Sequence, residues 1–312
     1  NSYTLENGIY LFLDKPRKVD LFYSNSELSD FFITNGNLKG DLFESISYIT
    51  GDRLEQDAKS YLNPTSPLPS SHTDGSSQLE IIGNCFTNMP KPSDEYIHRK
   101  VLEQELTTVI SDLDRFPVVT LVGKGGIGKT SLALNTIKQV TASDRFDIII
   151  WFSARDIDLL MEGPKQVQTK VLNQKDISAD YCQLVYPDRT ISDQVKFFSN
   201  ELTKNSFGRA LYIFDNFETL TNPIEVFEWI NTFIRNPNKV LITSRINRNF
   251  KADYPIEVSG MQDAECKSLI DSMAKKLNIE SLLTEKYIEE LSTESNGHPY
   301  IIKILLGEVA KN

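Results

Sequence analysis

The sequence has few of the residues that build disulfide frameworks or metal centres. Only three cysteines (Cys85, Cys182 and Cys266) and three histidines occur in 312 residues, and they lie far apart in the chain. An odd, scattered set of cysteines argues against a disulfide framework and for a reducing compartment, so we expect a cytoplasmic protein. The cysteine and histidine spacings typical of zinc sites are not present.

Long apolar runs and an excess of positive charge are also missing. The apolar runs have the length of strands, so we expect neither a transmembrane helix nor a membrane partner, and we find no signal peptide. The net charge is −10, from 33 basic and 43 acidic side chains. Because proteins that bind the phosphate backbone are usually basic, the composition argues against nucleic acid as a partner of this segment.

One glycine-rich stretch stands out, and it reads Gly-Lys-Gly-Gly-Ile-Gly-Lys-Thr over residues 123–130. It fits the phosphate-binding P-loop pattern, in which glycines let backbone N–H groups surround phosphate oxygens and the next helix adds its dipole. Lys129 can then reach the β- and γ-phosphates, and the Thr130 hydroxyl can hold Mg²⁺. The alternative is a glycine-rich turn with a surface lysine. An apolar strand before the loop and a helical pattern after it favour nucleotide binding.

Strand and helix patterns alternate around this loop. We expect strands at 118–122, 148–152, 211–214 and 240–243, each short and almost continuously apolar, as in a parallel sheet covered on both faces. Residues 260–310 carry only helical patterns. The expected fold class is therefore α/β: a P-loop NTPase with a parallel sheet covered by helices, followed by a helical subdomain.

The N-terminal region predicts a small mixed α/β segment. Two short strands are expected at 9–13 and 19–23, and helices from Ser26 to Phe32, at 41–49 and at 52–62. We find no catalytic constellation among these residues. The chain begins at Asn1 and stops within the apolar run 301–306, so we expect a piece of a longer protein, with 1–62 as the tail of an upstream effector or accessory domain.

The expected domain boundaries follow from composition. Residues 63–92 are rich in proline and serine and predict a linker. Residues 93–258 then form the P-loop nucleotide-binding domain, and residues 259–312 form a helical subdomain that is incomplete at the end of this chain.

Two further strands end in polar side chains. Asp215 closes the strand 211–214, where an aspartate of a P-loop enzyme binds the Mg²⁺ shell; the alternative is an ordinary aspartate in a turn. Glu218 is the nearest carboxylate that could act as a catalytic base, or it is merely a solvated or capping residue. Arg245 follows the strand 240–243, where it can sense the γ-phosphate or pair with a surface acid.

Seven motifs, in the expected order, resemble the signal-transduction ATPases with numerous domains (STAND proteins) of NB-ARC type. They lie at 96–100, 125–130, 146–153, 214–218, 243–245, 258–261 and 297–299. His98 and Lys100 depart from the family's first motif. Asn216 stands where P-loop ATPases commonly carry an acidic residue, which puts fast hydrolysis in doubt.

The resemblance implies an ATP/ADP-controlled switch that uses Mg²⁺ and is at most a slow ATPase. It implies adenine contacts from Ile97, Arg99 and Pro299, and phosphate contacts from Gly125, Gly126, Ile127, Gly128, Lys129, Thr130 and Ser131. Thr130 and Asp215 would hold Mg²⁺, and Lys129, Asp215, Glu218 and Arg245 would serve catalysis.

At the level of the whole protein, the resemblance implies a homo-oligomer when ATP is bound. It also implies a trigger ligand read by a missing C-terminal region and an N-terminal effector that acts in antiviral defence or programmed cell death. Two alternatives stay open from the sequence: an AAA+-like ATPase that acts on nucleic acid, and a nucleotide-regulated transcription regulator or scaffold.

Overall fold

The computed structural model describes the backbone of six strands between residues 2 and 57, and residues 68–111, 115–161, 163–246 and 253–311. The chain divides into two compact units, residues 1–68 and 69–312. Each unit has a sheet of its own.

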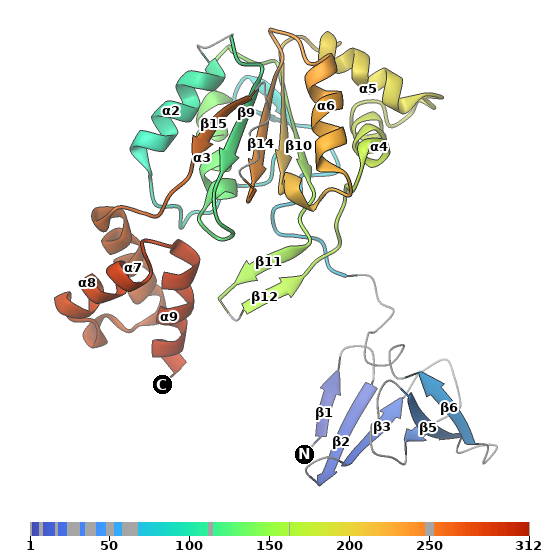
Figure 1. The fold of residues 1–312 in the computed structure, drawn as a ribbon, viewed down its shortest axis with the longest axis vertical. Coiled ribbons are helices and arrows are strands. Elements are labelled where there is room, and N and C mark those ends of the chain that lie inside the picture. Colours follow the sequence, from blue (N-terminus) through green and yellow to red (C-terminus); the bar gives the residue numbers. More distant parts are fainter. Residues whose placement is uncertain are drawn as a thin grey trace. The chain divides into compact units, whose positions relative to one another are not determined.

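The first unit is built on a six-stranded antiparallel sheet whose strands follow one another in chain order (Figure 1). The expected strands at 9–13 and 19–23 are confirmed. The strands are β1 (Ser2–Leu5), β2 (Ile9–Lys15), β3 (Lys18–Tyr23), β4 (Phe32–Thr34), β5 (Leu42–Ser47) and β6 (Arg53–Asp57).

The helices expected in this unit are wrong where the structure describes them. Residues 42–47 and 53–57 form strands that pair with each other, with Leu42 opposite Asp57. The helix expected from Ser26 lies mostly outside the described residues, and its last residue, Phe32, begins a strand. Short apolar runs fit either period, and cross-strand pairing, which the local sequence does not reveal, decides between them.

The second unit contains a seven-stranded sheet (Figure 1). All neighbouring strands are parallel except the last pair, β8 and β7, which are antiparallel. In spatial order the strands are β15 (Asp253–Glu257), β9 (Val118–Val122), β14 (Lys239–Ser244), β13 (Ala210–Asp215), β10 (Ile148–Ser153), β8 (Cys85–Thr87) and β7 (Glu80–Ile82).

The four central strands were all expected, whereas the outer three were not. Strands β7 and β8 lie within the range 63–92, which the sequence predicts as a linker. Cys85 and Met89, from the same range, are buried in the core beneath the sheet. The part of this range from residue 69 onward therefore belongs to the second unit.

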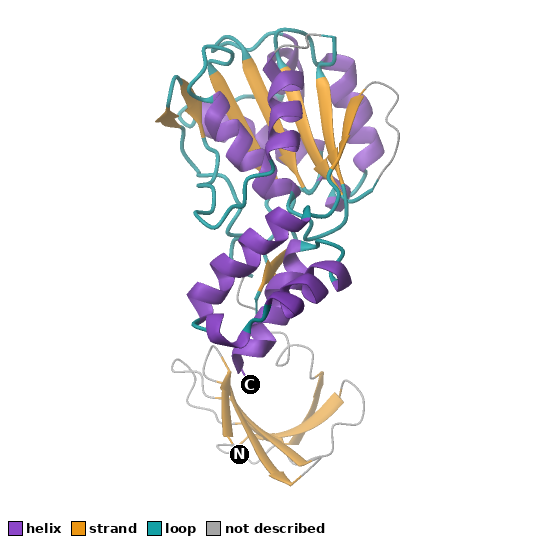
Figure 2. Ribbon diagram, turned by 90° about the vertical axis from the view of Figure 1, so that its left-hand side faces the viewer, coloured by secondary structure: helices purple, strands orange, loops and turns teal. Residues whose placement is uncertain are grey.

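Helices cover both faces of the seven-stranded sheet (Figure 2). Alternate residues of each strand point to opposite sides, so the sheet has two apolar faces. Two of the helices pack on one face and three on the other. On the first face lie α2 (Lys100–Ser111) and α3 (Lys129–Val140); on the second lie α4 (Gln174–Val185), α5 (Gln194–Thr203) and α6 (Pro223–Phe233).

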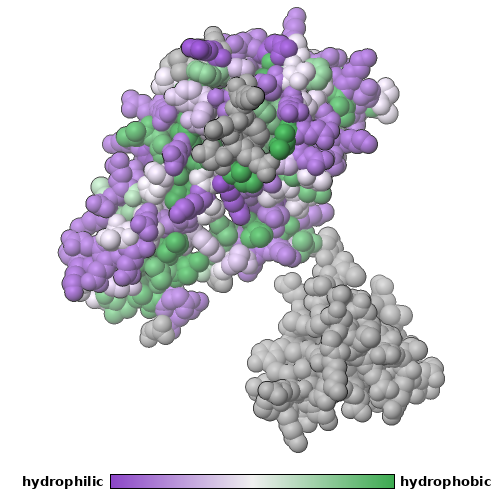
Figure 3. All heavy atoms as spheres, viewed as in Figure 1, coloured by the Kyte–Doolittle hydropathy of each residue, from purple (hydrophilic) through white to green (hydrophobic). Residues whose placement is uncertain are grey.

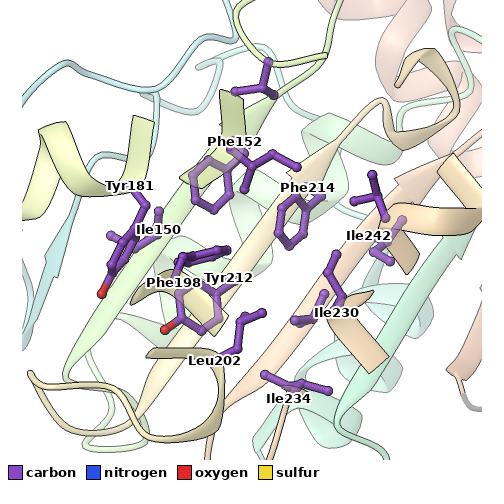
Figure 4. Packing of buried hydrophobic residues seen from close by; sticks show 14 of the residues in the cluster. Ile150, Phe152, Tyr181, Phe198, Leu202, Tyr212, Phe214, Ile230, Ile234 and Ile242 are labelled. Atoms are coloured by element: carbon purple, nitrogen blue, oxygen red, sulfur yellow. The ribbon is translucent and has the colours of Figure 1, made fainter. Parts of the chain in front are cut away.

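The second face is packed with aromatic rings (Figure 4). Phe152 stacks on Phe214 with ring centroids 5.0 Å apart, and Phe198 meets Phe152 edge-on at 5.8 Å. Tyr181 lies in the same cluster, and its hydroxyl donates to Glu201 over 2.7 Å. This aromatic layer packs on β10 and β13, and Asp215, which we expect at the site, lies at the end of β13.

The C-terminal part of the second unit is helical, as expected. It contains α7 (Asp263–Leu277), α8 (Glu285–Glu294) and α9 (Pro299–Lys311), which enclose a small apolar core of their own. Apolar side chains also reach the surface of this subdomain (Figure 3), among them Leu282, Ile301 and Leu305. Short 3₁₀ turns occupy Phe217–Thr219 and Glu280–Leu282.

A β-hairpin follows β10 in the chain. It pairs β11 (Ile157–Leu160) with β12 (Gly163–Gln166) in antiparallel fashion. Met161, at its turn, packs against the core of the helical subdomain. Among the helices that the structure describes, none is long and apolar enough to cross a membrane.

Candidate nucleotide-binding site

The glycine-rich loop connects β9 directly to α3, as the P-loop pattern requires. Gly126 and Gly128 adopt left-handed backbone conformations, with φ angles of 76° and 102°. Residues with a Cβ rarely adopt such angles, so glycine at these two positions lets the loop turn its amides inward. The N-terminus of α3 then points its free N–H groups at the space that the loop surrounds.

Lys129 lies buried at the start of α3, and the loop itself holds it. Its Nζ donates to the carbonyl oxygens of Gly123, over 2.7 Å, and Lys124, over 3.0 Å. Burial lowers the pKa of Lys129 to about 8, although the nearby Glu218 raises it. Among the residues that the structure describes, no carboxylate forms an ion pair with this ammonium, and a phosphate would supply the missing negative charge.

Asp215 lies at the end of β13, fully buried, with two hydroxyls aimed at it. Its Oδ1 accepts from Thr130 Oγ1 over 2.7 Å and from Thr243 Oγ1 over 2.8 Å. A hydroxyl and a carboxylate oxygen beside a phosphate-type loop fit Mg²⁺, which binds few protein oxygens together with phosphates and water. Within the described residues there is no cluster of three His, Cys, Asp or Glu side chains that would suggest an all-protein metal site.

Arg155 was not expected at the site. It follows β10, and its Nη2 donates to Thr130 Oγ1 over 2.7 Å and to Asp215 Oδ2 over 3.2 Å. Arg155 therefore brings a positive charge to the pair that we expect to bind Mg²⁺. The signal was available in the sequence, because residues that follow a parallel strand lie at the same sheet edge as Asp215 and Arg245.

Glu218 and Arg245 form an ion pair, with 3.1 Å between Arg245 Nε and Glu218 Oε1. Glu218 lies on the 3₁₀ turn after Asn216, and its side chain is largely buried. Arg245 lines the cavity next to Gly125. The structure thus brings the proposed catalytic base and the proposed phosphate sensor together.

These elements surround a cavity of about 330 Å³. Seven expected residues line it: Gly125, Gly126, Gly128, Lys129, Thr130, Ser131 and Arg245. Asn216, which the sequence places at the position of the usual acidic residue, also lines the cavity. The sequence does not predict the other lining residues, namely His72, Thr73, Lys91, Ser93, Leu134, Arg155, Ile157 and Leu159. Lys91, Lys129, Arg155 and Arg245 give the cavity a strongly cationic wall, which suits a polyphosphate.

Four residues expected to contact the nucleotide are not among the lining residues of this cavity. Ile127 is buried under the sheet, and Ile97 packs against the core of the helical subdomain. Arg99 donates from Nη2 to the carbonyls of Ser259 and Gly260 and pairs with Glu265. Pro299 is buried at the start of α9. The adenine contacts of Ile97, Arg99 and Pro299 and the phosphate contact of Ile127 stay predictions.

The start of α9 lies against the phosphate loop. A Cβ on Gly126 would be only 2.8 Å from Tyr300 Cβ and 3.0 Å from His298 Cε1. Burial lowers the pKa of His298, and the cations Lys124 and Lys129 lower it further. The helical subdomain therefore touches the loop that we expect to hold phosphate.

The NB-ARC domain matches residues 99–280, which include the phosphate loop, Asp215 and Arg245. The chain belongs to the NB-ARC family. An NB-ARC domain is a nucleotide-dependent signalling switch, and nucleotide binding in this family usually involves Mg²⁺. No curated protein sequence matches the chain.

Three solved structures are distantly similar to this NB-ARC chain. A Walker-type ATPase of Pyrococcus abyssi is 14% identical over 72% of this chain and 70% of its own, with a TM-score of 0.49. CDC6p of Pyrobaculum aerophilum is 15% identical over 70% and 64%, with a TM-score of 0.46.

The third is a STAND protein with a tetratricopeptide repeat sensor, PH0952 of Pyrococcus horikoshii. It is 19% identical over 67% of this chain, with a TM-score of 0.42. The present chain covers 29% of the length of PH0952.

Proposed function

We propose that this NB-ARC chain is an ATP/ADP-controlled switch in which ADP holds a closed form and ATP favours an open form. The open form assembles into a homo-oligomer and brings N-terminal effector domains together. The assembly acts in antiviral defence or programmed cell death, and its trigger is read by a region beyond residue 312.

One observation carries this proposal: the first turn of α9 touches the phosphate loop at Gly126. A ligand shifts a conformational equilibrium only if it interacts differently with the two states. Because the loop and the helical subdomain are in contact, a phosphate added at the loop changes the surface on which His298 and Tyr300 rest. Nucleotide can thus act on the position of the helical subdomain.

The chemistry of the site follows from its residues. The loop amides and Lys129 bind the phosphates, and Thr130 with Asp215 would hold Mg²⁺, which neutralises phosphate charge when bound. Arg245 contacts the γ-phosphate and so distinguishes ATP from ADP. Ile97, Arg99 and Pro299 enclose the adenine once the helical subdomain has closed on it.

Hydrolysis at this site is slow and resets the switch. Asn216 can orient a water molecule but cannot take its proton, and Glu218 is the nearest carboxylate that can. Glu218 is also paired with Arg245, so this ion pair connects the proposed base to the proposed phosphate sensor.

The test is an equilibrium titration of the chain with fluorescent ADP and ATP, together with light scattering in each nucleotide. We expect binding of both nucleotides and a larger particle with ATP. Lys129→Ala should abolish binding, whereas Lys175→Ala, an exposed lysine on α4, should not. Equal affinity in wild type and Lys129→Ala would contradict the assignment of the site.

A further inference from the structure

Arg155 occupies a position between two oxygens that we expect to bind Mg²⁺. Its Nη2 is 2.7 Å from Thr130 Oγ1 and 3.2 Å from Asp215 Oδ2. The side chain is only 16% exposed, so the guanidinium is held within the site and does not extend into solvent. Both oxygens belong to the phosphate-loop machinery and not to the surface.

A guanidinium nitrogen and a magnesium ion cannot share this position. Mg²⁺ binds oxygens at about 2.0–2.1 Å and keeps a shell of water and phosphate oxygens around it. The Thr130 hydroxyl and the Asp215 carboxylate can therefore serve Arg155 or the metal, but not both with the present geometry.

The buried carboxylate explains why a cation should be built in. Asp215 is fully buried, and a buried charge without a partner is costly. Lys129 directs its ammonium at the carbonyls of the loop. Among the described residues, Arg155 is the one that forms an ion pair with Asp215.

We propose that Arg155 is the resident cation of the metal-free site and gives way to Mg²⁺ when the metal enters with nucleotide. The inference rests on the proposed nucleotide binding and adds its regulation: the metal competes with a side chain of this chain. The metal-free site keeps its charge balanced, so nucleotide affinity depends only weakly on Mg²⁺.

A second carboxylate, that of Asp158, already lies within ion-pair distance of Arg155 and can pair with the displaced guanidinium. Arg155 Nη1 is 3.7 Å from Asp158 Oδ1 on β11. Asp158 is itself buried and fixed, because it accepts from Ser71 Oγ over 2.6 Å and from the His72 backbone N–H over 3.0 Å. Arg155 can thus leave Asp215 and stay paired, and its exit moves charge toward the hairpin that packs on the helical subdomain.

The test compares ADP dissociation constants of the whole chain in EDTA and in Mg²⁺. We expect the dissociation constant in EDTA, divided by that in Mg²⁺, to be small for wild type. The same ratio should be on the order of tenfold larger for Arg155→Met, because the variant needs the metal to neutralise Asp215. Arg189→Met removes an exposed arginine and should keep the wild-type ratio.

Two further measurements keep the test decisive if Arg155→Met folds poorly. Thermal unfolding with ADP should show a larger stabilisation by Mg²⁺ in Arg155→Met than in wild type. Arg155→Lys retains a positive charge and should bring the ratio to within about threefold of wild type, because the inference depends on a positive charge beside Asp215.

The outcomes separate this inference from the proposed function. If wild type binds ADP and the ratio of its dissociation constants in EDTA and in Mg²⁺ is the same in Arg155→Met, the role of Arg155 is overturned and the switch stays intact. Absence of ADP binding by wild type in both buffers would overturn the nucleotide site itself and this inference with it.

Discussion

Gly126 lies so close to Tyr300 that the space between them has no room for a methyl group on residue 126. A Cβ on Gly126 would be 2.8 Å from Tyr300 Cβ, and the glycine has a φ angle of 76°. The phosphate loop and the helical subdomain are therefore in close contact at Gly126.

Gly126→Ala should loosen the helical subdomain. The new methyl group must push α9 away, so hydrogen exchange at residues 299–311 should rise and ADP affinity should fall at least about tenfold. Gly128→Ala is the matched control: its φ angle of 102° strains the backbone of this variant too, but nothing lies within 4 Å of its Cβ. Equal exchange at 299–311 in the two variants would contradict the account.

Nucleotide affinity should fall as pH rises through 8. Burial lowers the pKa of Lys129 from 10.5 to about 8, so the free protein loses the ammonium charge above that pH. Because phosphate binds the protonated form, the apparent ADP dissociation constant should rise about tenfold between pH 7 and pH 9.

The effect on stability has the opposite sign. Between pH 8 and 10.5 the unfolded chain keeps a proton on Lys129 that the folded chain has lost, so this residue makes the free energy of unfolding rise with pH in that window.

The control for the affinity prediction is Lys129→Arg, which stays charged throughout, so its ADP affinity should be flat from pH 7 to 9. A pH dependence in Lys129→Arg equal to that of wild type would rule out Lys129 as the titrating group.

Glu218→Gln separates the two interpretations of this residue. If Glu218 takes the proton of the attacking water, ATP turnover should fall about 100-fold while ADP affinity changes by less than about threefold. Glu225→Gln, an exposed glutamate on α6, should leave both unchanged. Unchanged turnover in Glu218→Gln would leave Glu218 only its ion pair with Arg245.

Arg99→Ala should release the helical subdomain from the nucleotide-binding domain. Arg99 Nη2 donates to the carbonyls of Ser259 and Gly260 over 2.9 Å each, at the point where the helical subdomain begins. Without these bonds, hydrogen-exchange protection at 263–311 should fall about tenfold or more. Lys100→Ala, which changes an exposed neighbour, should retain full protection. An equal loss of protection in both variants would contradict the role of the Arg99 hydrogen bonds in holding the helical subdomain in place.

The central part of the fold could be predicted from sequence for a clear physical reason. The four central strands are buried on both faces, so they are continuously apolar and easily recognised. The edge strand β15 contains Pro255 and is half exposed, and β7 and β8 have three residues each, so no periodic signal marks them.

The site was predictable to the extent that it depends on local rules. The phosphate loop is a contiguous motif, and Asp215 and Arg245 follow parallel strands. Arg155 obeys the same rule after β10 and could have been found. The contacts of Arg99, His298 and Tyr300 depend on how the helical subdomain docks, which no local pattern determines.

The most direct test of the switch is the distance between the two parts that nucleotide is proposed to move. Spin labels at Lys175→Cys on α4 and Lys286→Cys on α8 use exposed positions, and the native cysteines are buried. With ADP we expect one narrow distance distribution, and with a non-hydrolysable ATP analogue a second, longer distance. Identical distributions in the two nucleotides, both bound, would contradict the proposal that ATP opens this chain.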